Sequence, residues 1–310
     1  MAKDADTLSR AAEAPSAEAD GSGRISAGIG APDPDKHPLA LLLGTWVGHG
    51  FNLIWRPHHG APDDHFLQLN LTGENTAFHA IGAPVPNRGL VQADIDLSGV
   101  RYLQQIHDDS GFPPPGGGGA LHLEPGFWLK VPPTSRPRSG QTITRLSSIP
   151  HGNAVLATGR ARTTPGPPRI PRSSTTPFGI GDPTNLIPFT TSDLSAPSPS
   201  RTKPLPARIT QRLVDNPNSL LTGVLAHQSV LSTTTLTVST HRAPGALSNI
   251  AFLKPNAEAV DLTATFWIQT VRGANGRSFR QLQYSQRLLL NFNGLSWPHV
   301  SVASLVLTGA

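Results

Sequence analysis

Cysteine is absent from this chain of 310 residues, and methionine occurs only at position 1. Without cysteine the protein cannot form disulfides, use a thiolate nucleophile or build cysteine-based zinc and iron–sulfur sites. The lone Met1 argues against a methionine axial ligand. The twelve histidines are therefore the main nitrogen ligands that the sequence offers.

Charged residues are sparse and scattered along the chain. The formal net charge of +5 comes mostly from isolated arginines, and the basic clusters with interleaved aromatics that mark nucleic-acid-binding surfaces are missing. No apolar run reaches the roughly 18–20 residues of a membrane span. The first residues show no charged segment followed by an apolar one, as a secretory signal would. We therefore expect no nucleic-acid partner, no membrane association and a cytoplasmic location.

Proline and glycine are frequent, with thirty-one and thirty copies, which argues against long helices and favours short elements joined by turns. Residues 1–36 contain few large apolar side chains, so we expect a disordered leader there. We interpret residues 37–310 as a single β-barrel domain with a Pro-rich insertion near 162–206. A short helix is expected near 217–227, where Asn216-Pro217 is a typical helix start.

Apolar and polar residues alternate over many short segments, which is the pattern of half-buried strands. Strand-like segments cover residues 44–55, 66–72, 76–81, 102–107, 120–129, 142–148, 154–160, 232–240, 260–269, 279–290 and 299–307. The connections indicate antiparallel pairing, and no βαβ rhythm or fixed-period repeat is present. The sequence therefore predicts an all-β protein, an antiparallel barrel of about ten strands whose interior can hold one small ligand.

Three segments resemble, in order, the motifs of one family. They are Gly44-Thr45-Trp46-Val47-Gly48-His49-Gly50, Leu121-His122-Leu123-Glu124-Pro125-Gly126-Phe127-Trp128 and Trp297-Pro298-His299-Val300. The family is that of the nitrobindins, small haem-binding β-barrels related to the lipocalin and fatty-acid-binding (calycin) architectures. Its members are about half as long as this chain, so residues 113–119 and 162–206 would be insertions. The family's methionine before the second-motif histidine is Leu121 here, and Phe51–Pro57 replace its Tyr-Pro pair.

The resemblance implies haem b as cofactor, with His299 as the iron ligand and His122 in the wall of the haem cavity. By the same resemblance, Trp46 and Gly48 belong to the pocket or the barrel floor. It further implies an open sixth iron position that binds nitric oxide or converts peroxynitrite to nitrate. Whether the protein is an enzyme of this kind is left open by the sequence.

Each of these residues also has a purely structural interpretation. His299 could be a rim histidine bonded to a turn carbonyl, and His122 could point outward. A haem-free alternative is a calycin-type carrier of an apolar small molecule, with Phe51, Phe127 and Phe266 in its cavity. A third reading is a β-sandwich without a cavity. The cluster of His58, His59, Asp63, Asp64 and His65 resembles a zinc site, but we interpret it as a solvated loop.

Overall fold

We describe the protein from a computed structural model, which defines residues 37–60, 64–110, 119–198, 201, 204–241 and 244–309. The leader expected in residues 1–36 lies outside the described residues, as do residues 113–118 of the second expected insertion. Among the described residues, no helix is long and apolar enough to cross a membrane.

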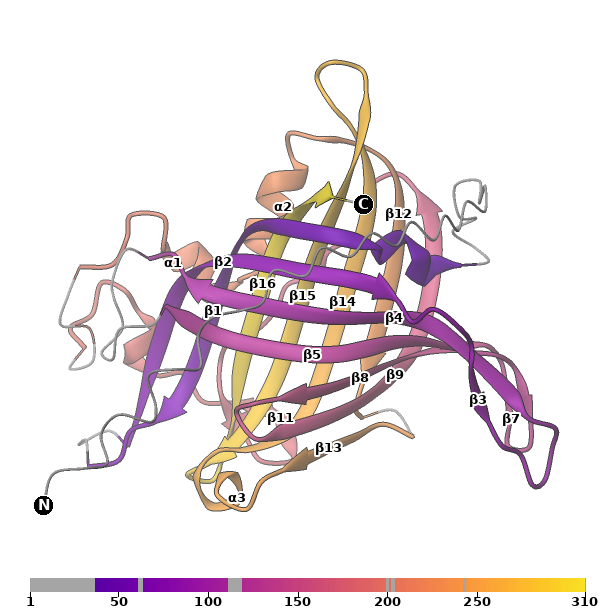
Figure 1. The fold of residues 1–310 in the computed structure, drawn as a ribbon. Coiled ribbons are helices and arrows are strands. Elements are labelled where there is room, and N and C mark those ends of the chain that lie inside the picture. Colours follow the sequence, from indigo (N-terminus) through magenta and orange to yellow (C-terminus); the bar gives the residue numbers. More distant parts are fainter. Residues whose placement is uncertain are drawn as a thin grey trace, which may run out of the picture. The chain divides into compact units, whose positions relative to one another are not determined.

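Ten strands of the described chain close into an antiparallel barrel, as the sequence predicts (Figure 1). Each strand pairs with the next in the following order, and β1 also pairs with β16 to close the ring. The order is β1 (Gly44–Pro57), β2 (His65–Ala80), β4 (Ile95–Asp108), β5 (Ala120–Val131), β8 (Thr142–Ile149), β9 (Asn153–Pro165), β12 (Ser229–Ser239), β14 (Glu258–Arg272), β15 (Ser278–Phe292) and β16 (Leu295–Gly309). Closure leaves the barrel without the two exposed edges that an open sheet has.

The remaining elements are short. The strands are β3 (Val85–Asn87), β6 (Thr134–Ser135), β7 (Arg138–Ser139), β10 (Phe178–Gly179), β11 (Asp182–Leu186) and β13 (Ala246–Asn249). The helices are α1 (Gln211–Asp215), α2 (Ser219–Leu225), α3 (Leu253–Asn256) and the 3-10 helices η1 (Pro38–Leu42) and η2 (Thr190–Ser192). The expectation of a single short helix was therefore too low for the described residues.

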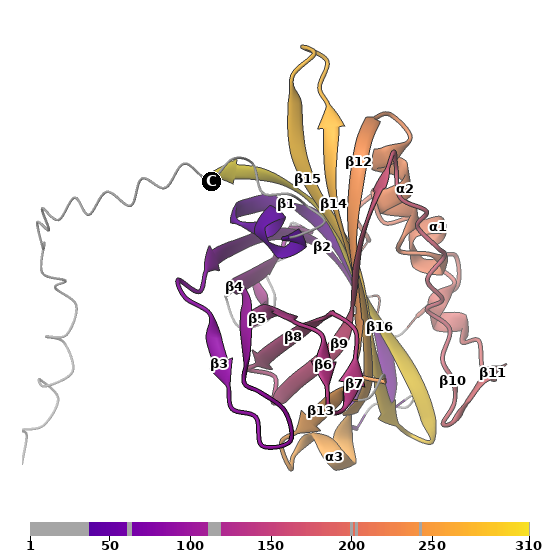
Figure 2. The same ribbon diagram turned by 90° about the vertical axis from the view of Figure 1, so that its right-hand side faces the viewer.

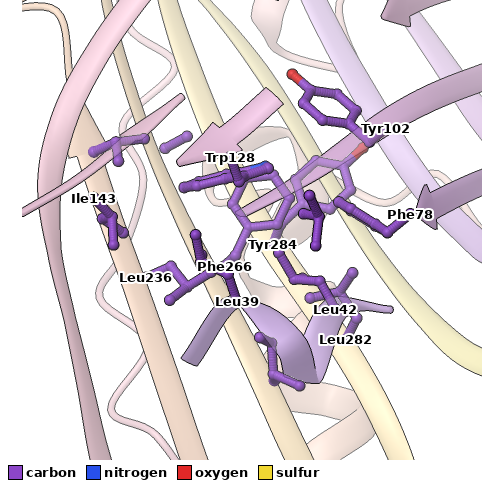
Figure 3. Packing of buried hydrophobic residues seen from close by; sticks show 14 of the residues in the cluster. Leu39, Leu42, Phe78, Tyr102, Trp128, Ile143, Leu236, Phe266, Leu282 and Tyr284 are labelled. Atoms are coloured by element: carbon purple, nitrogen blue, oxygen red, sulfur yellow. The ribbon is translucent and has the colours of Figure 1, made fainter. Parts of the chain in front are cut away.

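One end of the barrel is filled by apolar side chains. Residues of η1 lie across this end, with Leu39 and Leu42 buried, and the indole of Trp46 donates a hydrogen bond of 2.6 Å to the carbonyl of Leu42. Figure 3 shows Leu39 and Leu42 packed with Trp128, Phe266 and other inner residues. Because residues two apart on a strand face the same side, alternate positions of every barrel strand build this inner core.

The Pro-rich insertion packs against the outer wall of the barrel rather than over its mouth. Figure 2 shows β10, β11, α1 and α2 on the outer side of β12 and β16. β10 also extends the sheet by pairing with β16, from Phe178 to Ser296. A second apolar core fills this interface. It joins β1, β2, β14, β15 and β16 to two sets of residues, Ile170, Phe189, Leu194 and Leu205 of the insertion and Ile209, Leu213, Val214 and Leu221 of the segment that follows it. The described part of the insertion is thus an outer layer of the fold.

Two boundaries differ from those expected. The segments predicted at 66–72 and 76–81 form one continuous strand, β2, because Glu74 points into the barrel and is hydrogen-bonded there instead of marking a loop. The predicted helix is α2, which begins at Ser219 after the cap residue Asn218. Asn216 instead ends α1, and its side-chain oxygen accepts a hydrogen bond from the backbone of Ser173.

Candidate functional site

A cavity of about 380 Å³ lies in the barrel at the end opposite η1. On β1, Trp46 lies near the start of the strand at the closed end of the barrel. Asn52, Ile54 and Arg56 lie near the end of the same strand and line the cavity. Its wall comes from β1, β2, β4, β5, β14, β15 and β16, with the β8–β9 turn and α3 at the rim. The volume is within the roughly 300–1,000 Å³ range of small-molecule pockets, and the closed barrel with a cavity excludes the sandwich interpretation.

Aliphatic side chains and three imidazoles share the wall of this cavity. The aliphatic residues are Ile54, Ile106, Leu121, Ile149, Leu253, Leu262, Leu288 and Leu290, and the imidazoles are those of His122, His151 and His299. A second hollow of about 410 Å³ lies outside the barrel, lined largely by residues 172–177 of the insertion. We place the candidate site in the barrel because only there, among these two, do apolar walls and titratable groups converge.

His299 lies in the cavity wall, as the sequence suggested, with its ring held by Asn52. The His299 Nε2 and the Asn52 Oδ1 are 2.7 Å apart, and the Ser301 hydroxyl donates to the same oxygen at 2.8 Å. Because an amide oxygen only accepts, this arrangement gives His299 a proton on Nε2 and a lone pair on Nδ1. Burial, together with the nearby His122 and His151, lowers the pKa of His299 to about 3. The imidazole is therefore neutral at neutral pH.

His122 points into the barrel on the same face of β5 as Glu124. Its Nε2 lies 3.1 Å from the Oε2 of Glu124, and its ring is 5.7 Å from that of His151. His151, in the β8–β9 turn, contacts the carbonyl of Leu121 at 3.2 Å. Burial and the neighbouring His122 lower the pKa of His151. Three imidazoles from three separate segments thus meet at one cavity.

Behind His122 lies a buried ion pair between Glu124 and Arg145, which are 0% and 1% exposed. Burial alone would raise the pKa of Glu124, but the Arg145 guanidinium and the hydrogen bond from His122 hold it below its usual range. Arg145 also donates to the hydroxyl of Tyr102 at 2.9 Å and to the Oε1 of Gln286 at 2.6 Å. Such a buried pair is costly to desolvate, and its hydrogen bonds to His122, Tyr102 and Gln286 offset part of that cost.

A second buried carboxyl, Glu74, lies under the cavity floor. It accepts hydrogen bonds from the hydroxyl of Tyr284 at 2.7 Å and from Gln104 and Thr76 at 2.8 Å each. Burial raises the pKa of Glu74 despite these three donors. Tyr284 and Gln104 also line the cavity, so they connect a bound molecule to a carboxyl that it cannot touch directly.

Trp46 and Gly48, the other two residues implied by the resemblance, lie outside the cavity wall. Trp46 is fully buried in the inner core at the closed end of the barrel. Gly48 lies where β1 approaches β16 closely, since a Cβ there would be 2.2 Å from the carbonyl oxygen of Ser304. Both positions therefore support the barrel floor and its closure, and neither lines the cavity.

The phenylalanines expected to line a carrier cavity do not line it. Phe51 belongs to the outer core, Phe127 is 44% exposed and Phe266 packs in the inner core at the closed end. The expectation was wrong because it counted apolar residues without knowing on which side of the closed sheet each strand would place them. The apolar wall is aliphatic instead.

Within the described residues, no group of three or more His, Cys, Asp or Glu side chains could hold a bare metal ion. His58 contacts Phe66, and His65 packs among Trp55, Phe189 and Trp297. Asp63 lies outside the described residues.

The sequence did not identify several residues of the site. His151 carried no pattern of its own, and only folding brings its turn to His122. Arg145, Glu74 and Asn52 occupy inward positions where a rule of apolar-in and polar-out expects hydrophobic residues. The one usable signal was the break in that rule, because polar residues on an inward face mark functional sites in natural proteins.

Comparison with known proteins found no match: no protein family, no curated protein and no solved structure corresponds to this chain.

Proposed function

We propose that the protein binds one small molecule in the histidine-walled cavity of its barrel. The observation that carries this proposal is the position of His299, a neutral imidazole in the wall of a cavity of about 380 Å³. A neutral imidazole is a metal ligand and a hydrogen-bonding group at once. The aliphatic residues around it supply the contact area on which affinity for an organic molecule depends.

The ligand that we propose first is haem, with His299 as the residue that would hold the iron. The residues fit this group in their chemistry, because the imidazole is neutral and faces an aliphatic wall. When bound, haem would supply a Lewis-acidic iron with an open coordination position, which binding nitric oxide or isomerising peroxynitrite to nitrate requires. The protein's part would be to orient the group and to exclude water.

The hydrogen bond to Asn52 sets a condition on haem binding. It involves Nε2, the ring nitrogen that stands clear of the backbone and that we assign to iron. Coordination through Nε2 would require this hydrogen bond to break and the ring proton to move from Nε2 to Nδ1. The side chains of Asn52 and Ser301 would then remain hydrogen-bonded to each other at the edge of the site.

The same hydrogen bond favours a second candidate, a haem-free carrier of an apolar molecule. In the described conformation the Nε2 of His299 is already bonded, so the ring can serve as part of a polar floor beneath an apolar ligand. The wall residues Ile54, Ile106 and Leu288 would contact such a ligand directly.

A haem titration of the purified protein separates these candidates. Ferric haem is added to the wild type and to His299→Ala, and the Soret absorption band and a fluorescent apolar probe are followed in parallel. A shifted Soret band in the wild type that is lost in His299→Ala, with probe binding retained, supports the haem function. Equal haem spectra in both proteins contradict it. Probe binding without any haem binding leaves the carrier function, and binding of neither overturns the proposal.

A further inference from the structure

The cavity wall has an uneven charge distribution. Of the described residues that line it, one is an arginine, Arg56, and three are histidines, whereas none is an aspartate or a glutamate. A bound molecule therefore meets donors and positive charge but no carboxylate on the surface it touches. Such a wall favours a ligand that carries negative charge over a neutral one of the same shape.

Arg56 is positioned by its cross-strand neighbour. It lies on β1 opposite Phe66 of β2, and its guanidinium carbon is 4.0 Å from the centre of the Phe66 ring. None of the ion pairs between described residues includes Arg56. A cation–π contact orients the guanidinium but leaves its N–H groups available for hydrogen bonds. Arg56 is therefore a positioned cation at the edge of the cavity, and no carboxylate of the described residues is paired with it.

The depth of the site indicates where the negative group of a ligand would lie. On β1, Ile54 pairs with His299, and Arg56 is two residues further towards the end of the strand, at the mouth. At the floor, the buried cation Arg145 is already paired with Glu124, and Glu74 lies behind Tyr284. An anionic group would therefore be attracted weakly at the floor of the cavity and most strongly at its mouth.

Amide groups add donors to the wall. The Oδ1 of Asn52 accepts from His299 and Ser301, and the Oε1 of Gln286 accepts from Arg145. With their oxygens so used, the NH₂ groups of Asn52 and Gln286 are the parts of these side chains left to interact with a ligand. They could bind an acceptor oxygen along the body of the molecule.

We infer that the ligand is an amphipathic carboxylate, with its anionic group bound by Arg56 at the mouth and its apolar body against the aliphatic wall near His299. The inference rests on the function proposed above and specifies the class of molecule that the site takes. Haem, with its two propionate groups, and a fatty acid share this chemistry. A neutral apolar molecule of either shape lacks the group that Arg56 would bind.

The test compares each acid with its ester. Dissociation constants are measured for haem, haem dimethyl ester, oleate and methyl oleate, using absorption for the haems and displacement of a fluorescent probe for the lipids. The proteins are the wild type, Arg56→Gln, Arg56→Lys and the control Arg101→Gln, which changes an exposed arginine on the barrel wall. There are two acid–ester pairs, haem with its dimethyl ester and oleate with methyl oleate. For at least one of these pairs, both the wild type and Arg101→Gln should bind the acid about tenfold or more tightly than the ester.

In Arg56→Gln this preference should fall to near unity through loss of affinity for the acid, while affinity for the ester stays the same. Arg56→Lys should restore part of the preference, because it keeps the charge but not the planar fork. If the preference appears for the haem pair, the site binds haem propionates, and if it appears for the oleate pair, the site binds a fatty acid. Equal binding of acid and ester by the wild type, or a preference that persists in Arg56→Gln, overturns the inference and leaves the proposed function standing. If the wild type binds none of the four, both are overturned.

Discussion

At the scale of single residues, the site depends on three histidines and on the groups to which their rings are hydrogen-bonded. The pKa of His299 is lowered to about 3, and His122 is bonded to a carboxylate that is itself paired with Arg145. The sequence indicated His122 and His299 through motifs, and both lie in the cavity wall. It did not indicate Asn52 or Arg145, because a single sequence does not show which inward-facing polar residues will be hydrogen-bonded to one another in the fold.

Replacing Asn52 tests whether its hydrogen bond competes with iron. In Asn52→Ala the Nε2 of His299 has lost its amide partner, so haem binding no longer has to break a bond worth about 1 kcal/mol. We expect haem affinity, measured by absorption titration, to rise about fivefold, with the affinity for a neutral apolar probe unchanged. A fall in haem affinity would show instead that Asn52 orients the bound ring.

The lowered pKa of His299 makes stability depend on pH. The unfolded chain binds a proton near pH 6.5, whereas the folded site does so only near pH 3. The contribution of His299 to the free energy of unfolding is therefore complete above pH 6.5 and is lost as the pH falls from there towards 3. Urea unfolding between pH 7 and 5 should show a loss of roughly 1 kcal/mol per pH unit below 6 from this group. His151, whose pKa is also lowered, adds in the same direction.

The control for this dependence is His299→Gln, which keeps a polar side chain but does not titrate. Its unfolding free energy should decline less steeply over the same range, because one of the coupled protons is gone. Identical slopes in the two proteins would contradict a neutral His299 whose pKa is lowered by its surroundings.

At the scale of elements, period-two alternation located all ten barrel strands but did not give the full length of each. The strand β2 was expected in two pieces because the charged residue Glu74 in its middle breaks the apolar pattern of a strand. The short helices α1 and α3 were missed, since segments of five and four residues carry no helical period. The motif glycine Gly48 was expected at the pocket or the barrel floor, and its neighbours show that it allows β1 and β16 to pack closely.

Gly48 and Gly223 form a matched pair for testing that packing. A Cβ at Gly48 would lie 2.2 Å from the carbonyl oxygen of Ser304 and 2.8 Å from the Cα of Leu305, both in the backbone, whereas nothing lies within 4 Å of one at Gly223 in α2. Gly48→Ala should therefore lower the free energy of unfolding by roughly 1–3 kcal/mol as an overpacked site. Gly223→Ala should raise it by about 0.5–1 kcal/mol. Equal effects in chemical denaturation would contradict the close approach of β1 and β16.

At the scale of the whole folded unit, the described residues build two cores on the two sides of one sheet. The inner core closes one end of the barrel and leaves the cavity at the other, and the outer core joins the Pro-rich insertion to the wall. The barrel could be predicted because alternation and turns are local signals. The packing of the insertion could not, since its apolar residues are isolated along the chain and gather only in three dimensions.

The outer core predicts a separation between stability and binding. Leu221 of α2 is fully buried in it, on the far side of the sheet from the cavity. Leu221→Ala should lower the free energy of unfolding by roughly 2–5 kcal/mol while leaving ligand affinity at moderate temperature unchanged. The control Leu186→Ala, at a residue that is 54% exposed, should change neither. A loss of affinity in Leu221→Ala without a loss of stability would show that α2 takes part in binding.

The central claim, that a neutral His299 faces a ligand-binding cavity, is tested most directly by nitrogen NMR of the histidine side chains. Resonances of His299 are assigned by comparison with His299→Gln and followed from pH 8 to pH 5, then during addition of a diamagnetic porphyrin acid and of oleate. The account predicts a neutral ring protonated on Nε2 throughout that pH range, with resonances that shift on saturation with at least one ligand. A His299 that titrates near pH 6.5 and is unaffected by both ligands would contradict it.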